Sequence, residues 1–213
     1  MTEATNGAQA GRREREAARR RSDLLAVASE IFAEKGYDGT PISEIARVAE
    51  VSLATVYALF KSKDVLYQAV IARAAESIRD TVQAHVDAIE DPAERLLALI
   101  DCLLRCFDEN RALMRIYTLG SHGLPWNIRQ TLGEPLVEIY REFLDYVSEL
   151  ARSAAAAGRL GDLDPDAVAL AIAGTVNATS AEWIESGRSE PISDAAPAIR
   201  AIVKRLLVEV EAP

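Results

Sequence analysis

Signals that start helices recur along this chain and constrain its fold more than any other feature of the sequence. At three places a capping side chain is followed directly by proline, at Thr40-Pro41, Asp91-Pro92 and Asp164-Pro165. Proline fits the first position of an α-helix because the amide hydrogen that it lacks would have no partner there. Apolar residues then follow at intervals of three and four, the period of a helix with one buried face. Aromatic residues, which favour strands, make up only 6% of the chain, so the sequence predicts an all-α protein.

The periodic segments predict about nine helices and no strand. Three short helices come first, over residues 17–35, 41–49 and 53–60, and a long helix over 64–90 follows them. The remaining helices are expected at 92–108, 110–119, 133–158, 165–187 and 193–210, with a loop over 121–131.

Charge is distributed unevenly along the 213 residues, which are enough for one large domain or two small ones. Residues 1–72 carry ten basic and ten acidic side chains, so the whole net charge of −9 lies in residues 73–213. Six arginines fall within Gly11 to Arg21 and form a cationic segment. We therefore expect a disordered basic arm over 1–16, a DNA-binding unit over 17–63 and a larger helical domain over 64–213.

Several classes of function are disfavoured by what the sequence lacks. No apolar run approaches the roughly 20 residues of a membrane span, so we expect a cytoplasmic protein with no membrane partner. The two cysteines, Cys102 and Cys106, are one helical turn apart without a third ligand nearby, which favours buried thiols over a metal or redox site. Neither a nucleophile with a neighbouring base nor a phosphate loop is recognisable. We expect no enzymatic activity, no metal and no cofactor.

The second and third short helices, at about residues 42–61, have the spacing of a helix-turn-helix unit, whose second helix enters the major groove of DNA. On a helical projection Leu53, Val56 and Phe60 point inward, whereas Ala54, Thr55 and Ala58 point outward. No acidic residue lies between Val51 and Lys63, which leaves the amides of residues 53–55 available to a phosphate. Phosphates are also within reach of the side chains of Tyr57, Lys61 and Lys63.

Other interpretations remain open at this point. Short helix-turn-helix arrangements also occur in proteins that do not bind DNA, Tyr57 can be a core aromatic, and both lysines can be ordinary solvated charges. The chain can then be a helical small-molecule carrier or enzyme without a DNA role, or an interaction module. The arginine segment, with Arg19 and Arg20 next to the first helix, favours DNA.

Residues 24–66 carry a resemblance to a known family, through residues that stand at its spacing: Phe32, Gly36, Tyr37, Ile45, Ala46, Val51, Ser52, Thr55, Tyr57, Phe60, Lys63 and Leu66. This segment resembles the DNA-binding domain of the TetR family of transcriptional regulators. The resemblance implies a homodimer, a two-fold symmetric operator of double-stranded DNA, and a C-terminal domain whose small-molecule ligand changes DNA affinity. Transferred by position, the residues implied in DNA binding are Arg19, Arg20, Thr40, Ser43, Ser52, Leu53, Ala54, Thr55, Tyr57, Ala58, Lys61 and Lys63.

The chain departs from the family pattern at four positions. Pro41 stands where a hydroxyl is common, Glu50 replaces the usual turn glycine, Ala54 replaces a common glycine, and Leu59 stands where a polar or aromatic side chain is frequent. The recognition helix therefore has few hydrogen-bonding side chains. Contacts to thymine methyl groups and DNA shape are the expected sources of specificity.

The C-terminal domain supplies candidates for a largely apolar ligand site: Leu103, Cys106, Phe107, Met114, Tyr117, Trp126, Tyr140, Phe143, Asn177 and Trp183. The resemblance places a dimer interface on the last two helices, at Ala173, Gly174, Ala178, Ala181, Ile199, Ile202, Val203 and Leu206. Either set can instead be plain core of one subunit. By analogy with the family, we expect a repressor that an unknown small, largely apolar inducer releases from a palindromic operator by shifting the helix of residues 64–90.

Overall fold

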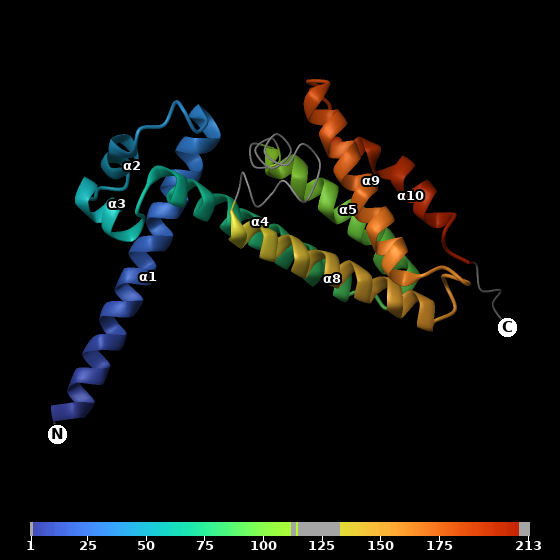
Figure 1. Ribbon diagram of the computed structural model, residues 1–213, viewed down its shortest axis with the longest axis horizontal. Coiled ribbons are helices and arrows are strands. Elements are labelled where there is room, and N and C mark those ends of the chain that lie inside the picture. The colour runs from blue at the N-terminus through green and yellow to red at the C-terminus, as the bar shows by residue number, and fades with distance from the viewer. Residues whose placement is uncertain (1, 112–113, 115–132, 209–213) are drawn as a thin grey trace. The chain divides into compact units, whose positions relative to one another are not determined.

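The computed structural model describes residues 2–111, 114 and 133–208, with the side chains of residues 2–10, 13 and 14 left aside. This part of the chain is entirely helical and contains no strand, which confirms the predicted all-α class (Figure 1). Its elements are α1 (Thr2–Lys35), α2 (Ile42–Val48), α3 (Leu53–Leu59), α4 (Lys63–Asp87), α5 (Pro92–Glu109), α8 (Glu134–Ala156), α9 (Pro165–Glu185), the 3₁₀ helix η2 (Ile192–Ala195) and α10 (Ala196–Lys204). The loop predicted at 121–131 and nearly all of the helix predicted at 110–119 lie outside the described residues.

The chain divides into two compact units, residues 1–71 and 72–213, called unit 1 and unit 2 below. The division falls within α4, whereas the predicted boundary lay at the start of this helix, after residue 63. Because α4 contributes to both units, it forms the covalent connection between them.

Unit 1 is built on one apolar cluster to which α1, α2, α3 and the start of α4 all contribute. Leu24, Ala28, Phe32, Ile45, Val56, Phe60 and Leu66 are its most buried members. The rings of Phe32, Tyr37 and Tyr67 extend this cluster, with Tyr67 lying edge-on to both other rings. This cluster therefore holds both α2 and α3, the two helices on either side of the α2–α3 turn.

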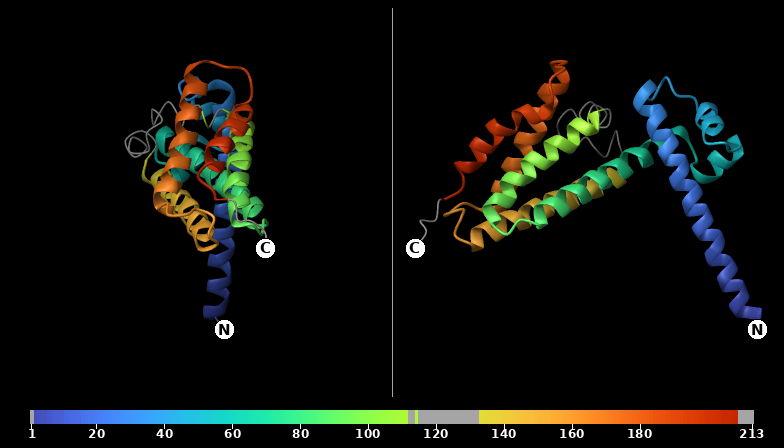
Figure 2. Two further views of the ribbon diagram at one scale, coloured as in Figure 1. Left: turned by 90° about the vertical axis from the view of Figure 1, so that its right-hand side faces the viewer. Right: turned by 180° about the vertical axis from the view of Figure 1, so that it is seen from behind.

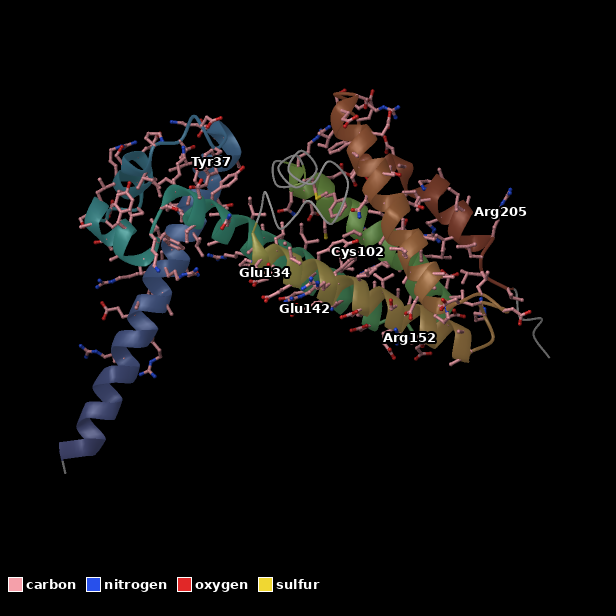
Figure 3. The ribbon with its side chains drawn as sticks, viewed as in Figure 1. Tyr37, Cys102, Glu134, Glu142, Arg152 and Arg205 are labelled. Atoms are coloured by element: carbon pink, nitrogen blue, oxygen red, sulfur yellow. The ribbon has the colours of Figure 1, made fainter. Side chains whose placement is uncertain are left out.

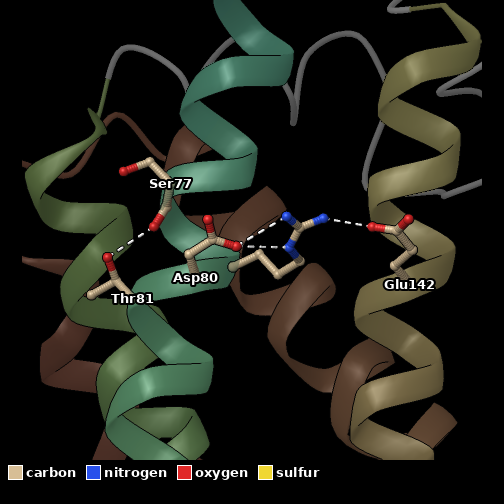
Figure 4. A network of polar contacts seen from close by, with 5 residues as sticks. Ser77, Asp80, Thr81 and Glu142 are labelled. Carbon is tan, nitrogen blue, oxygen red and sulfur yellow. Dashed lines mark hydrogen bonds and ion pairs between the residues drawn. The ribbon is translucent and has the colours of Figure 1, made fainter.

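Unit 2 is built around α5, whose apolar residues supply much of its core, including Leu96, Leu97, Leu99, Ile100 and Leu104. Helices α8 and α10 pack against α5, and α9 packs against α8. Helix α4 runs beside α8 in both views of Figure 2. An ion pair of 2.5 Å between Arg79 on α4 and Glu142 on α8 joins the two helices (Figure 4). The Tyr146 hydroxyl also donates to Asp87 over 2.9 Å.

Two of the three cap-proline pairs begin helices as predicted. The Asp91 carboxylate accepts from the amides of Ala93 and Glu94 at the start of α5, and the Asp164 carboxylate accepts from Asp166 at the start of α9. The third prediction was wrong, because Thr40 does not cap α2. Its hydroxyl instead donates to the carbonyl of Gly36 over 2.8 Å and closes the turn after α1.

Both ends of the chain differ from prediction. Helix α1 begins at Thr2, whereas residues 1–16 were expected to be disordered. Alanine, arginine and glutamate, which favour helix without a buried face, dominate from residue 12 on, and the Glu16–Arg20 ion pair of 2.6 Å adds to this. The last helix begins at Ala196 and ends at Lys204, instead of running over 193–210. Pro197 fits only the first turn of an α-helix, so a 3₁₀ turn precedes it.

Candidate functional site

Ser52 caps the start of helix α3, and its side chain accepts from the amide of Thr55 over 3.0 Å. Val56 and Phe60 are 1% and 2% exposed and pack into the core of unit 1. Leu53, Ala54, Tyr57 and Ala58 form the exposed side, which we call the α3 outer face.

Two predictions about this helix were wrong. Leu53, predicted to point inward, is 45% exposed, because at the first helical position its side chain lies beyond the end of the packed surface. The amide of Thr55, predicted to be free for a phosphate, is taken by the Ser52 cap. The Ser52 and Thr55 hydroxyls also bond each other over 2.8 Å, and Thr55 is only half-exposed.

The turn between α2 and α3 holds Glu50 at a φ of +53°, the left-handed conformation that glycine adopts most easily. The next amide, of Val51, donates to the carbonyl of Ala46 over 3.0 Å and closes the end of α2. This is the position where the sequence has glutamate in place of the family's usual glycine. The turn keeps its shape at a cost of about 1 kcal/mol.

Lysine side chains follow α3 closely. Lys61 is exposed. The ammonium of Lys63 lies 4.2 Å from the centre of the Tyr37 ring, a cation–π contact. Tyr37, labelled in Figure 3, donates its hydroxyl to Asp64, and this hydrogen bond, with burial, raises the pKa of Tyr37 to about 12. Lys63 is thus held in place by the ring beneath it.

The arginine segment contributes differently from the prediction. Arg19 and Arg20 are exposed, and Arg20 pairs with Glu16. It is Arg21, not among the predicted residues, whose guanidinium lies over the Phe60 ring at 4.8 Å, beside the end of α3. The helical period could have predicted that Arg21 faces the core of unit 1, since it shares one stripe of α1 with Leu24, Leu25 and Ala28.

Ser43 and Thr40, also among the residues implied in DNA binding, lie in different surroundings. Ser43 is exposed on α2. Thr40 has no exposed surface, and its hydroxyl is bonded to the chain itself. This corrects the place of Thr40 among the residues implied in DNA binding, since its side chain is buried and closes the turn after α1.

Most described candidates for a ligand site lie in the core of unit 2. Leu103, Cys106, Phe107, Met114 and Trp183 are buried, whereas Tyr140, Phe143 and Asn177 are half-buried. Burial raises the pKa of the Tyr140 hydroxyl. A hydrogen bond that Tyr140 shares with Asn177 acts in the opposite direction and has the smaller effect. Tyr117 and Trp126 lie outside the described residues.

Trp183 and the cysteines have visible structural roles. The Trp183 indole donates to the carbonyl of Glu190 over 2.8 Å and lies under the guanidinium of Arg111 at 4.4 Å, so it fastens the segment after α9. Cys102 and Cys106 are buried free thiols of α5, and burial raises the pKa of Cys106 to about 11. A thiol with so high a pKa is a poor nucleophile.

The predicted dimer residues divide into two groups. Gly174, Ala178 and Ile202 are exposed, Ile202 by 54%. Ala181 and Leu206 are half-buried. Ala173, Ile199 and Val203 are buried in their own chain, which corrects their assignment, because the inner stripe of α10 completes the core of unit 2. Leu170, which was not predicted, is 60% exposed on the same side of α9 as Gly174.

Comparisons with known proteins agree with this architecture over both units. Residues 24–70 match the family model for bacterial regulatory proteins of the tetR family, and residues 89–206 match the model for the tetracyclin repressor-like C-terminal domain. The second match alone covers more than half of the chain. The chain belongs to the TetR family. Members of this family are DNA-binding transcriptional regulators and not enzymes.

A curated relative is the HTH-type transcriptional activator FasR of Mycolicibacterium smegmatis, 37% identical over 82 residues, which are 38% of this chain and 37% of FasR. The chain thus matches less than half the length of such relatives. Among solved structures, FadR of Bacillus subtilis in complex with stearoyl-CoA is 18% identical with a TM-score of 0.70, covering 85% of this chain and 96% of that one. AibR in complex with isovaleryl coenzyme A and operator DNA is 22% identical with a TM-score of 0.62, covering 86% and 97%. At these identities the two structures establish the fold.

Over residues 2–111, 114 and 133–208, no three histidine, cysteine or acidic side chains are grouped to hold a metal ion. Within these ranges, too, no helix is both long and apolar enough for a membrane span.

Proposed function

We propose that this TetR-family regulator is a homodimeric repressor that leaves a palindromic operator when a ligand with an apolar chain binds unit 2. The observation that carries the proposal is the α3 outer face, which is exposed, free of carboxylates and flanked by Lys61 and Lys63. A protein bound over an operator blocks polymerase by occupancy alone, so repression needs no further contact.

Two copies of α3 would enter successive major grooves about 34 Å apart. The exposed apolar residues of α9 and α10, Leu170 and Ile202 foremost, support a dimer built on these helices. A two-fold dimer in turn implies a palindromic operator, since each half-site meets the same α3 residues. Arg21, Ser43, Lys61 and Lys63 are the proposed phosphate contacts.

For the inducer we propose an acyl-coenzyme A thioester. FadR and AibR, which share the fold, were solved with stearoyl-CoA and isovaleryl coenzyme A. The candidate residues on α5 and α8 are mainly apolar and suit an acyl chain, with Tyr140 and Asn177 as polar partners. Helix α4 would carry the effect, because it alone continues from unit 2 into unit 1.

The test begins with DNA selected by the full chain from a random duplex library. Binding of the selected duplex should be saturable and should weaken steeply with salt, because phosphate contacts release counterions. Replacing both Tyr57 and Lys63 by alanine should weaken binding at least tenfold. An unenriched library would contradict the DNA role and favour a carrier.

A ligand titration completes the test. Acyl-CoAs of increasing chain length should release the duplex, whereas free coenzyme A should not. Release by none of them would overturn the proposed ligand class. In a reporter strain, loss of the regulator should raise expression from the selected operator, and a fall would contradict the repressor role.

A further inference from the structure

The chemistry of the α3 outer face is unusual for a surface that must read base edges. Three of its four residues, Leu53, Ala54 and Ala58, have no hydrogen-bonding group in the side chain. The fourth, Tyr57, is 49% exposed and offers one hydroxyl.

The two hydroxyls at the start of the helix are already engaged. Ser52 and Thr55 bond each other, and Ser52 also accepts from the Thr55 amide. Their capping role fixes the helix start, and the bond between them uses one of the two hydroxyl protons, so only one hydroxyl donor remains there. Bidentate recognition of guanine or adenine needs arginine, lysine, asparagine or glutamine, and residues 52–60 contain none of these.

One base feature in the major groove is apolar, the 5-methyl group of thymine. We infer that this regulator reads its operator mainly through thymine methyl groups, held against Leu53, Ala54 and Ala58. The inference rests on the proposed DNA binding and names the base chemistry recognised there. Alanine side chains keep the helix backbone close to the base edges, and Leu53 at the first helical position has 45% of its surface available.

The flanking cations serve a different purpose. Lys61, Lys63 and Arg21 carry positive charge around α3, and contacts from such side chains to phosphates add affinity without sequence information. Sequence preference therefore depends on the apolar face itself.

Deoxyuridine tests this directly, because it pairs like thymidine and lacks only the methyl group. The full chain is used to select DNA from a thymine library. The selected duplex is then synthesised with uracil at each thymine in turn and at all of them. Each contacted methyl should contribute about fourfold in affinity, since removing a methyl-sized apolar contact is worth about 0.8 kcal/mol. The fully substituted duplex should bind more than tenfold weaker.

Variants separate direct contact from a change in DNA shape. Leu53→Ala should bring the thymine-to-uracil affinity ratio closer to one at some positions, and Ala58→Gly at others. The control is Leu163→Ala, since Leu163 is a leucine of similar exposure, 44%, in unit 2. This control variant should keep the thymine-to-uracil affinity ratio of the unchanged protein. Equal binding of thymine and uracil duplexes, or a ratio unchanged in both α3 variants, would overturn the inference. Failure of the first selection would instead overturn the DNA role itself.

Discussion

Helix α3 buries one of its seven residues, whereas α5 buries ten of its eighteen. The shorter helix is held by the Ser52 cap and by Val56 and Phe60, which leaves most of its surface free to meet a partner. The longer one gives its surface to the core of unit 2. Substitutions in α5 are therefore expected to change stability, and substitutions on the α3 outer face to change binding.

The largest effect expected from this contrast is that of Leu104→Ala. Leu104 has no exposed surface, so the substitution should lower the free energy of unfolding by about 2–5 kcal/mol. Both tryptophans of the chain, Trp126 and Trp183, belong to unit 2, so their fluorescence in urea reports this unit. Leu53→Ala, in unit 1, should change the unfolding followed by circular dichroism, which reports the helices of both units, by less than about 0.5 kcal/mol. Equal effects would contradict the contrast.

Asp91→Ala removes the α5 cap and the ion pair with Arg159, and should cost about 1–2 kcal/mol. Hydrogen bonds from the amides of Glu94 and Ala93, with Arg159 nearby, lower the pKa of the Asp91 carboxyl. A lowered pKa stabilises the fold above the unfolded-state value of about 3.9, and this stabilisation is lost as pH falls through the folded-state pKa. Urea titrations at pH 7 and pH 3 should differ less for the variant. An unchanged difference would contradict this role.

Tyr37→Phe tests how unit 1 holds Lys63. The variant keeps the ring beneath the ammonium and loses the hydrogen bond to Asp64, at a cost of about 1 kcal/mol. DNA affinity should fall less than for Tyr37→Leu, which removes the ring as well. Anisotropy titrations compare the two, and equal losses would show that the ring does not position Lys63.

Glu50→Gly should have the smallest effect, with the opposite sign. Glycine relieves the positive φ of +53° but adds freedom to the unfolded chain, so stability should rise by no more than about 1 kcal/mol. Circular dichroism during thermal unfolding measures the change. A clear loss of stability would mean that the glutamate side chain is needed at the turn.

Local signals predicted the starts of α5 and α9 and the position of α3 well. Asp91 and Asp164 cap helices because the cap and its amides lie within four residues, and Val56 and Phe60 are buried where the helical period places them. Thr40 carries the same cap-proline signal, yet its hydroxyl bonds the preceding turn, a contact that the period does not encode. Ile199 and Val203 likewise form an apolar stripe, but only the packing of α10 on α5 shows that it faces its own chain.

The central claim is that the α3 outer face contacts DNA, and Ala58→Glu tests it most directly. Glutamate is a good helix former at this exposed position, so the circular dichroism spectrum and the thermal unfolding that it follows should not change. Its carboxylate would enter the negatively charged major groove, and affinity for the selected duplex should fall at least about 100-fold. Ala84→Glu, at an exposed position of α4 in unit 2, should leave affinity unchanged. Full DNA affinity in Ala58→Glu would contradict the account.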